Sequence, residues 1–144
     1  MSARNTDDGR VAELWHVLNE TEKRVAALKL TKERFVSDES LQGRINVDAI
    51  FMCVFRATEE AGNMSDETRR EHPTIPWRAI HGMRNIFAHD YGKLDRAAIW
   101  NTVVADFPVL KSFCLDYSAL HGIELSGDTD RSVPRPLDTS PDVL

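Results

Sequence analysis

Residues 76–92 gather side chains of the types that handle phosphate groups and protons. Their sequence is PWRAIHGMRNIFAHDYG. At about 100° per residue, one face of a helix here carries a guanidinium, an amide and two imidazoles around one small residue: His81, Arg84, Asn85, Ala88 and His89. A separate, narrow arc is apolar and predicts the side that faces the core: Ile80, Met83 and Phe87. The segment therefore predicts an amphipathic helix with a polar face capable of chemistry.

Arg84 and His89 are the two side chains of this face best suited to act on one phosphate. They lie about 7.5 Å apart along a helix axis, so both can reach a single phosphate-sized group. Arginine stays charged and offers a planar fork that fits phosphate oxygens. An imidazole with a pKa near ~6.5 can accept or donate a proton near neutral pH.

Each of these residues also has an interpretation without a catalytic role. The two histidines could be ordinary half-exposed helix residues, and Arg84 could simply pair with a carboxylate. Tyr91 could pack its ring beside Trp100. A zinc site shared by His81 and His89 is not expected, because about 12 Å of helix separates them and no cysteine or third histidine lies near. We expect no metal and no cofactor.

The rest of the body shows helical periodicity, without an alternating strand pattern. An N-terminal helix is expected after the capping candidates Thr6, Asp7 and Asp8. Its apolar face has helical spacing: Val11, Leu14, Trp15, Leu18, Val25 and Ala26. Thr31 is expected to cap a short turn that runs to Phe35.

A long helix is expected to open at Ser37 or Asp38 and to run to about Ala61. Residues 45–57 of this helix are apolar on nearly every side. Such a helix is typical of the centre of a bundle or of a subunit interface. The helix with the polar face is expected to begin with Pro76, because proline is well tolerated at the first helical position.

The polar helix should run to about His89, with Gly92 marking its end. Asp95 is expected to cap a further helix, and Asp106 and Pro108 to start a last one. Together these elements predict an all-α helical bundle.

Length and composition lead to expectations about the domain bounds and the location of the chain in the cell. The 144 residues fit one domain, which we expect over residues 8–120. Residues 121–144 carry three prolines, five acids and two arginines, and we expect this acidic tail to be disordered. No apolar run approaches the ~20 residues that cross a bilayer, so we expect no membrane segment. The N-terminus lacks the apolar part of a signal peptide, and Cys53 and Cys114 are the only cysteines; both features favour a cytoplasmic location.

The spacing Arg84-x4-His89-x-Tyr91 matches the Arg-x4-His-x-Tyr motif of the HEPN superfamily, and the chain resembles the HepT family within it. The likeness extends to IPW at residues 75–77, GMRN at residues 82–85, YGKLD at residues 91–95, Trp100 and DFPVL at residues 106–110. It covers most of residues 8–115. It departs at residues 59–61, Glu-Glu-Ala, where the family commonly has Gly-Glu-Ala, which leaves the role of Glu60 open.

The resemblance implies a HEPN-type bundle that forms a homodimer and cleaves RNA without a metal at the dimer interface. Arg84 and His89 would be the working pair, and Asn85 would orient the His89 ring or donate to the phosphate. Cleavage with the ribose 2′-hydroxyl as nucleophile needs a proton acceptor, a proton donor and charge stabilisation at phosphorus. Imidazole and guanidinium groups supply these functions. Gly82 on the same helix would permit close approach of a second helix.

The resemblance also implies a partner. The chain would be the toxin of a type VII toxin–antitoxin pair, and an MNT-type nucleotidyltransferase antitoxin would transfer AMP to the motif tyrosine, Tyr91. The added phosphodiester anion and nucleoside beside Arg84 would block RNA, on the same electrostatic grounds as phosphorylation. Gly92 would let the active site of the partner approach the hydroxyl closely.

Two other functions compete with this hypothesis. The chain could be a non-catalytic nucleotide- or substrate-binding companion of a nucleotidyltransferase, which the net charge of −5 favours because RNA affinity depends on phosphate contacts. It could also be a purely structural dimerisation domain, which leaves the polar face without a purpose. An RNA-cleavage assay with and without His89 separates an enzyme from a binding protein.

Overall fold

The computed structural model describes residues 3–125, and within this range it contains helices and turns but no strand. The predicted all-α bundle is thus confirmed. The elements in chain order are α1 (Ala3–Ala27), α2 (Lys32–Ser37), α3 (Leu41–Gly62), α4 (Asp66–Glu71), α5 (Trp77–His89), the 3-10 turn η1 (Tyr91–Lys93), α6 (Arg96–Asn101), the π turn η2 (Thr102–Asp106) and α7 (Phe107–His121). The structure describes the first five residues of the expected tail: His121 ends α7, Gly122 caps it and Leu125 is buried. Residues 126–144 lie outside the described residues.

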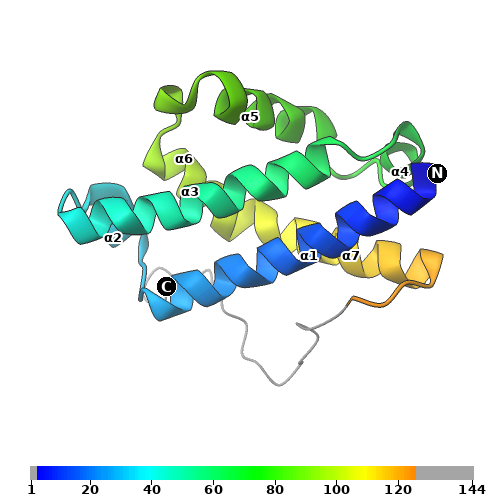
Figure 1. The fold of residues 1–144 in the computed structure, drawn as a ribbon, viewed down its shortest axis with the longest axis horizontal. Coiled ribbons are helices and arrows are strands. Elements are labelled where there is room, and N and C mark those ends of the chain that lie inside the picture. Colours follow the sequence, from blue (N-terminus) through cyan, green and yellow to red (C-terminus); the bar gives the residue numbers. More distant parts are fainter. Residues whose placement is uncertain (1–2, 126–144) are drawn as a thin grey trace.

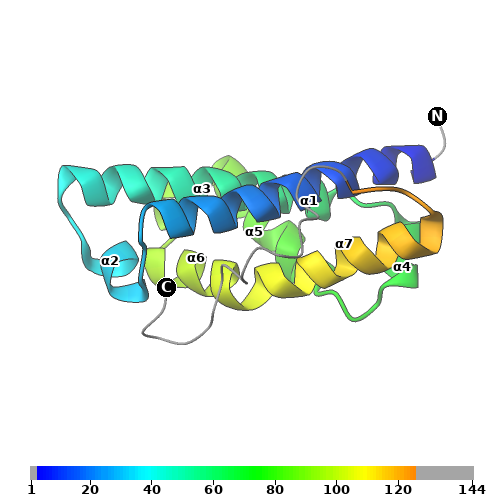
Figure 2. The same ribbon diagram turned by 90° about the horizontal axis from the view of Figure 1, so that it is seen from below.

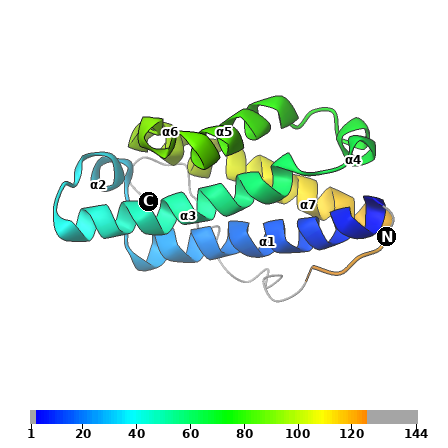
Figure 3. The same cartoon turned by 45° about the horizontal axis from the view of Figure 1, so that its top comes forward.

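The long helices form two layers. Figure 1 shows α1 and α3 side by side in opposite directions, with α5 along the other side of α3. Seen from below, α6 and α7 form a second layer against α1 and α3 (Figure 2). Figure 3 shows α3 between α1 and α5, with α2 at one end of the molecule and α4 at the other. The central place of α3 agrees with its apolar middle.

The buried face of α3 follows helical spacing, with fully buried side chains three or four residues apart: Ile50, Val54, Ala57 and Ala61. Burial does not extend all round this helix, because the apolar side chains of Ile45 and Met52 remain about half exposed, at 51% and 53%. These two side chains lie on solvent-facing turns of a helix whose other sides pack against α1 and α5.

Aromatic side chains tie the shorter helices to α3. The ring centroid of Phe35 on α2 lies 6.4 Å from that of Phe51 on α3 and 5.5 Å from that of Trp100 on α6. Phe87 of α5 meets Phe51 edge-on at 6.1 Å and Phe55 at 5.4 Å. Aromatic pairs at such distances stabilise a core beyond the area they bury. Phe87 therefore fixes which face of α5 turns inward.

The starts of α2, α5 and α6 agree with the predicted ones to within one residue, while α2 runs to Ser37, two residues beyond its predicted end at Phe35. Thr31 caps α2 by accepting from the backbone N–H of Arg34, and Asp95 caps α6 by accepting from that of Ala98. Pro76 immediately precedes the first residue of α5, which ends at His89 as expected. Gly92 lies within the 3-10 turn that follows.

Other predicted boundaries were wrong. The long helix starts at Leu41 with Ser40 as its cap, while the Asp38 carboxylate accepts from the backbone N–H of Ser40 at 2.9 Å. The short helix α4 was not predicted. The last helix does start after Asp106, with Pro108 in its first turn, as predicted. The side chain of Asp106, however, makes no capping hydrogen bond, because the backbone stays helical from α6 through the π turn into α7.

Asp7 caps a helix other than its own. Helix α1 begins at Ala3, so the expected caps Thr6, Asp7 and Asp8 lie inside it. The buried Asp7 carboxylate instead accepts from the backbone N–H of Ser65 at 3.1 Å, and from the hydroxyls of Ser65 and Thr68 at the start of α4. The prediction placed this carboxylate at the wrong helix because its partners are about sixty residues away.

Replacing Asp7 with alanine should lower the free energy of unfolding by about 1–3 kcal/mol, because it leaves buried hydroxyl and amide donors without an acceptor. Urea denaturation of the two proteins measures this difference. Asp48, exposed on α3, provides the control, since a surface Asp48→Ala change is expected to stay within about 0.5 kcal/mol. Equal losses in the two variants would show that the Asp7 contacts add nothing to stability.

Candidate functional site

The packing of α5 decides which of its residues meet solvent. Phe87 is buried against α3, while Ile80 and Met83 are half buried on the same side. This is the core arc that the sequence predicted. The opposite side of α5 is consequently open, and both His81 and His89 are exposed there.

The start of α5 is also anchored. The indole N–H of Trp77 donates to the carbonyl oxygen of His72 at 2.9 Å, and the ring of Trp77 meets Phe113 of α7 edge-on with centroids 5.2 Å apart. Ile75, just before the helix, is buried. The Ile-Pro-Trp segment therefore attaches the first turn of α5 to the second layer of the bundle.

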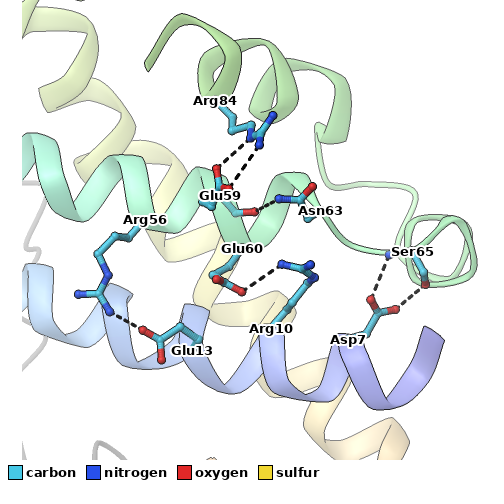
Figure 4. Close-up of polar contacts among 9 residues, drawn as sticks. All are labelled: Asp7, Arg10, Glu13, Arg56, Glu59, Glu60, Asn63, Ser65 and Arg84. Carbon is cyan, nitrogen blue, oxygen red and sulfur yellow. Dashed lines mark hydrogen bonds and ion pairs between the residues drawn. The ribbon is translucent and has the colours of Figure 1, made fainter. Parts of the chain in front are cut away.

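Arg84 reaches down from α5 to a carboxylate on α3. Its Nε donates to Oε2 of Glu59 at 2.9 Å, and its Nη2 donates to Oε1 of the same residue at 3.3 Å. Figure 4 shows the two side chains pointing toward one another across the space between the helices. The ion pair raises the pKa of Arg84 and, chiefly through the same hydrogen bonds, lowers the pKa of Glu59. Arg84 is thus paired with a carboxylate, as one of the two interpretations of the sequence allowed.

The other two predicted catalytic residues differ in their surroundings: Asn85 contacts Arg84, whereas His89 is exposed. Nη1 of Arg84 lies 3.5 Å from Oδ1 of Asn85, so the structure brings these two residues together. His89 is the last residue of α5 and its side chain is exposed. Its imidazole is therefore available to a ligand or to a second protein chain.

Tyr91 begins the 3-10 turn directly after α5, separated from His89 by Asp90. Gly92 beside it is exposed. The expectation that the Tyr91 ring packs beside Trp100 lies outside the described residues. Trp100 itself is buried against Phe35.

Below the Arg84–Glu59 pair, a row of charges joins α3 to α1. Arg10 of α1 pairs with Glu60 at 3.5 Å, and Glu13 of α1 pairs with Arg56 (Figure 4). Burial raises the pKa of Glu60 despite the nearby arginine. Glu60, whose role the sequence left open, therefore contacts the N-terminal helix and not the arginine of the motif.

Glu59 is the residue of this site that sequence reasoning missed. The sequence drew attention to residues 59–61 but raised the question of Glu60. Glu59 lies 25 positions from Arg84, and only the packing of α3 against α5 brings the two together. A general signal existed, since a half-buried arginine needs an acceptor, but the chain offers 23 acidic residues to choose from.

We also searched the described residues for metal-binding clusters and for reactive cysteines. Among residues 3–125, no three His, Cys, Asp or Glu side chains lie close enough to hold a metal ion. Cys53 and Cys114 are both free and buried, and burial raises the pKa of the Cys114 thiol, so it is not a nucleophile at neutral pH. No helix in the same range is long and apolar enough to cross a membrane.

The helical bundle, with an arginine, an asparagine and an exposed histidine at motif spacing on α5, defines a domain of the HEPN type. Comparison with protein families identifies the group within that class. The family model described as ribonuclease HepT-like matches residues 18–116, and the chain belongs to this family.

Individual relatives carry ribonuclease names. Putative RNase MJ1380 of Methanocaldococcus jannaschii is 33% identical over 81 residues, which cover 54% of this chain and 74% of the relative. Putative RNase TTE0752 of Caldanaerobacter subterraneus is 30% identical over 99 residues, covering 68% of this chain and 84% of the relative. Probable ribonuclease HepT of Thermococcus cleftensis is 40% identical over 63 residues, covering 41% and 57%. No solved structure is significantly similar to the chain.

Proposed function

We propose that this protein is a metal-independent ribonuclease and the toxin of a type VII toxin–antitoxin pair. The observation that carries the proposal is the exposed face of α5, where Arg84, held from below by Glu59, precedes the exposed imidazole of His89 by five residues. The HepT-like family and the ribonuclease names of the relatives support the same reaction.

In the proposed reaction the 2′-oxygen of a ribose forms a bond to the adjacent phosphorus while the bond from phosphorus to the 5′-oxygen breaks. One imidazole accepts the proton of the 2′-hydroxyl and another donates a proton to the departing 5′-oxygen. His89 of each of two copies supplies these groups, and proton transfer of this kind contributes typically about 10²–10⁴-fold. The guanidinium of Arg84 stabilises the charge that develops on the phosphate oxygens.

The requirement for two histidines is one reason to propose a homodimer. The exposed side of α5 supplies a second, because small and apolar residues follow one another there at helical spacing: Ala79, Gly82 and Ile86, with His89 next in the series. Ile86 is 40% exposed, and a Cβ on Gly82 would meet nothing within 4 Å among the described residues outside its own stretch of α5. Packing α5 against its copy would cover this stripe and bring the two His89 side chains to one cleft.

Light scattering at high micromolar concentration should therefore show a dimer. A stable interface of this kind buries about 1,200–2,000 Å² or more in total. Ile86→Glu places a charge in the proposed interface and should give a monomer. Leu120→Glu, at a 61% exposed position on α7, is the matched control and should leave the dimer intact. A monomeric wild-type protein would contradict the proposed shared cleft.

Control of the activity is proposed to act on Tyr91. An MNT-type nucleotidyltransferase antitoxin transfers AMP from ATP to the phenol oxygen, and pyrophosphate leaves. The position of Tyr91 directly after α5, beside the exposed Gly92, supports access by a second enzyme. The added anion then competes with RNA phosphate for Arg84.

A second function, that of a non-catalytic nucleotide-binding companion, is favoured by the net charge of −5 and by the neutralisation of Arg84 by Glu59. Incubation of the purified protein with labelled RNA in the presence of EDTA separates the two. Cleavage that persists in EDTA and disappears in His89→Ala supports the ribonuclease. RNA binding without cleavage would favour the companion.

A further inference from the structure

The geometry of the Arg84–Glu59 pair leaves one end of the guanidinium free. An arginine has five N–H donors arranged as a planar fork. Glu59 accepts from Nε and Nη2, which is the side of the fork, and Oδ1 of Asn85 lies 3.5 Å from Nη1. Glu59 therefore leaves free the end of the fork, where Nη1 and Nη2 each point one donor away from Cδ. Two parallel donors placed in this way suit two oxygens of one phosphate.

We propose that Glu59 is a positioning residue for RNA cleavage, which holds the side of the Arg84 guanidinium so that the end of the fork meets the scissile phosphate. The inference rests on the proposed function, because it assigns Glu59 a task in that same site. Glu59 touches no reacting atom; it acts only through Arg84.

The packing of α3 against α5 supports a fixed orientation. A Cβ placed on Gly62, in the last turn of α3, would lie 3.8 Å from Cβ of Arg84 and 3.8 Å from Cα of His81. The two helices therefore approach each other closely next to the ion pair, so that a single added methyl group on α3 would reach van der Waals contact with α5. The Arg84 and Glu59 side chains are 29% and 37% exposed, so the pair is half buried between the helices and does not extend freely into water.

The end of α3 holds Glu59 itself in place. The side-chain amide of Asn63 donates to the carbonyl oxygen of Glu59 at 2.7 Å, and the backbone N–H of Asn63 donates to the carbonyl oxygen of Glu60 at 3.4 Å. The carboxylate therefore extends from a backbone that is hydrogen-bonded up to the end of the helix. An arginine held in this way loses less conformational freedom when it binds a phosphate than a free one does.

Glu59 could instead compete with RNA for Arg84, and the two roles differ in which donors they need. A competitor would occupy the donors that the phosphate uses and would have to leave before RNA binds. The side-on contact leaves the two end donors available, so carboxylate and phosphate can bind Arg84 at the same time. The geometry therefore favours positioning over competition.

Steady-state cleavage of a short labelled RNA by Glu59→Ala and Glu59→Gln tests the proposal. We expect Glu59→Ala to lower kcat by about 10–100-fold, since a small misplacement of a catalytic group costs up to about 10² in rate. The KM should change little by comparison. Glu59→Gln keeps one acceptor for Arg84 and should give an intermediate kcat. An unchanged or higher kcat/KM in Glu59→Ala would overturn the proposal and indicate competition.

Glu13→Ala is the matched control. Glu13 also pairs with an arginine of α3, Arg56, and its removal changes the net charge by the same amount without touching Arg84 (Figure 4). Its kcat and KM should equal those of the wild type. Thermal melts of all variants exclude unfolding as the cause of a lower rate.

A measurement without RNA separates this proposal from the ribonuclease itself. The NMR signal of the Arg84 Nε–H, assigned with Arg84→Lys, should be protected from solvent exchange in the wild type and lose that protection in Glu59→Ala. Addition of inorganic phosphate should shift the Nη signals of Arg84 while the Nε–H stays protected. Loss of Nε–H protection on phosphate binding would overturn the positioning role. If phosphate binds with Nε–H retained but no RNA is cleaved, the proposed ribonuclease fails while the positioning of Arg84 by Glu59 stands.

Discussion

Replacing His89 with alanine is expected to lower RNA cleavage by about 10²–10⁴-fold, which is the usual contribution of a side chain that transfers a proton in the transition state. The imidazole is exposed at the end of α5, so its removal should leave the fold unchanged. A surface substitution of this kind shifts the free energy of unfolding by about 0.5 kcal/mol at most. Initial cleavage rates and thermal melts measure the two quantities.

Arg84→Ala should cause a comparable loss, about 10²–10³-fold, because it removes the donors that stabilise charge on the phosphate. Its cost in stability is expected to be small, since the pair with Glu59 is partly solvated.

The matched controls for these two variants come from the same helix. His81→Ala and Arg78→Ala each remove an exposed side chain of the same type from α5 and should retain most of the activity. Cleavage at the parental rate by His89→Ala or by Arg84→Ala would refute the assignment of that residue. A loss of equal size in the controls would show that α5 tolerates no change, and that the two motif residues have no special role.

Tyr91→Phe should separate activity from its control. The change removes the phenol oxygen that would accept AMP and keeps the aromatic ring, so we expect a variant that still cleaves RNA at least in part. The same variant should resist neutralisation by the nucleotidyltransferase partner and ATP. Growth of cells that produce both proteins, and cleavage assays with both purified proteins, measure the resistance.

Intact mass measurement of the co-produced wild-type protein provides the direct observation. We expect one or more added AMP units, located on a peptide that contains Tyr91. The chain has one other tyrosine, Tyr117, which is fully buried and donates to Asp8 at 2.6 Å, so Tyr117→Phe is the control that should leave neutralisation intact. Neutralisation of Tyr91→Phe without modification would mean that the partner acts by binding alone.

The sequence predicted the motif helix well because local signals determine it. Pro76 predicted where this helix begins, and the apolar residues Ile80, Met83 and Phe87 predicted the face that turns inward. In the structure Phe87 is buried on that face. Thr31 and Asp95 were also found, because a capping side chain and its helix are neighbours in sequence.

What the sequence could not predict depends on contacts between distant segments. Asp7 satisfies the start of α4 from 58 to 61 positions away, and Glu59 binds Arg84 from 25 positions away. Capping rules and helical periodicity describe neighbours along one element, so they do not identify such pairs.

The contact from Asp7 to α4 also couples the opening of α4 to the opening of the first turns of α1 in the native state. A helix of six residues, such as α4, is too short to be stable alone. When the first turns of α1 detach, α4 loses its buried acceptor, and both segments should open as one cooperative unit. Amide hydrogens of α4 are then expected to exchange with deuterium at the rate set by opening of α1. A segment fused to the N-terminus that destabilises the first turns of α1 should therefore also destabilise α4, which leads into the motif helix α5.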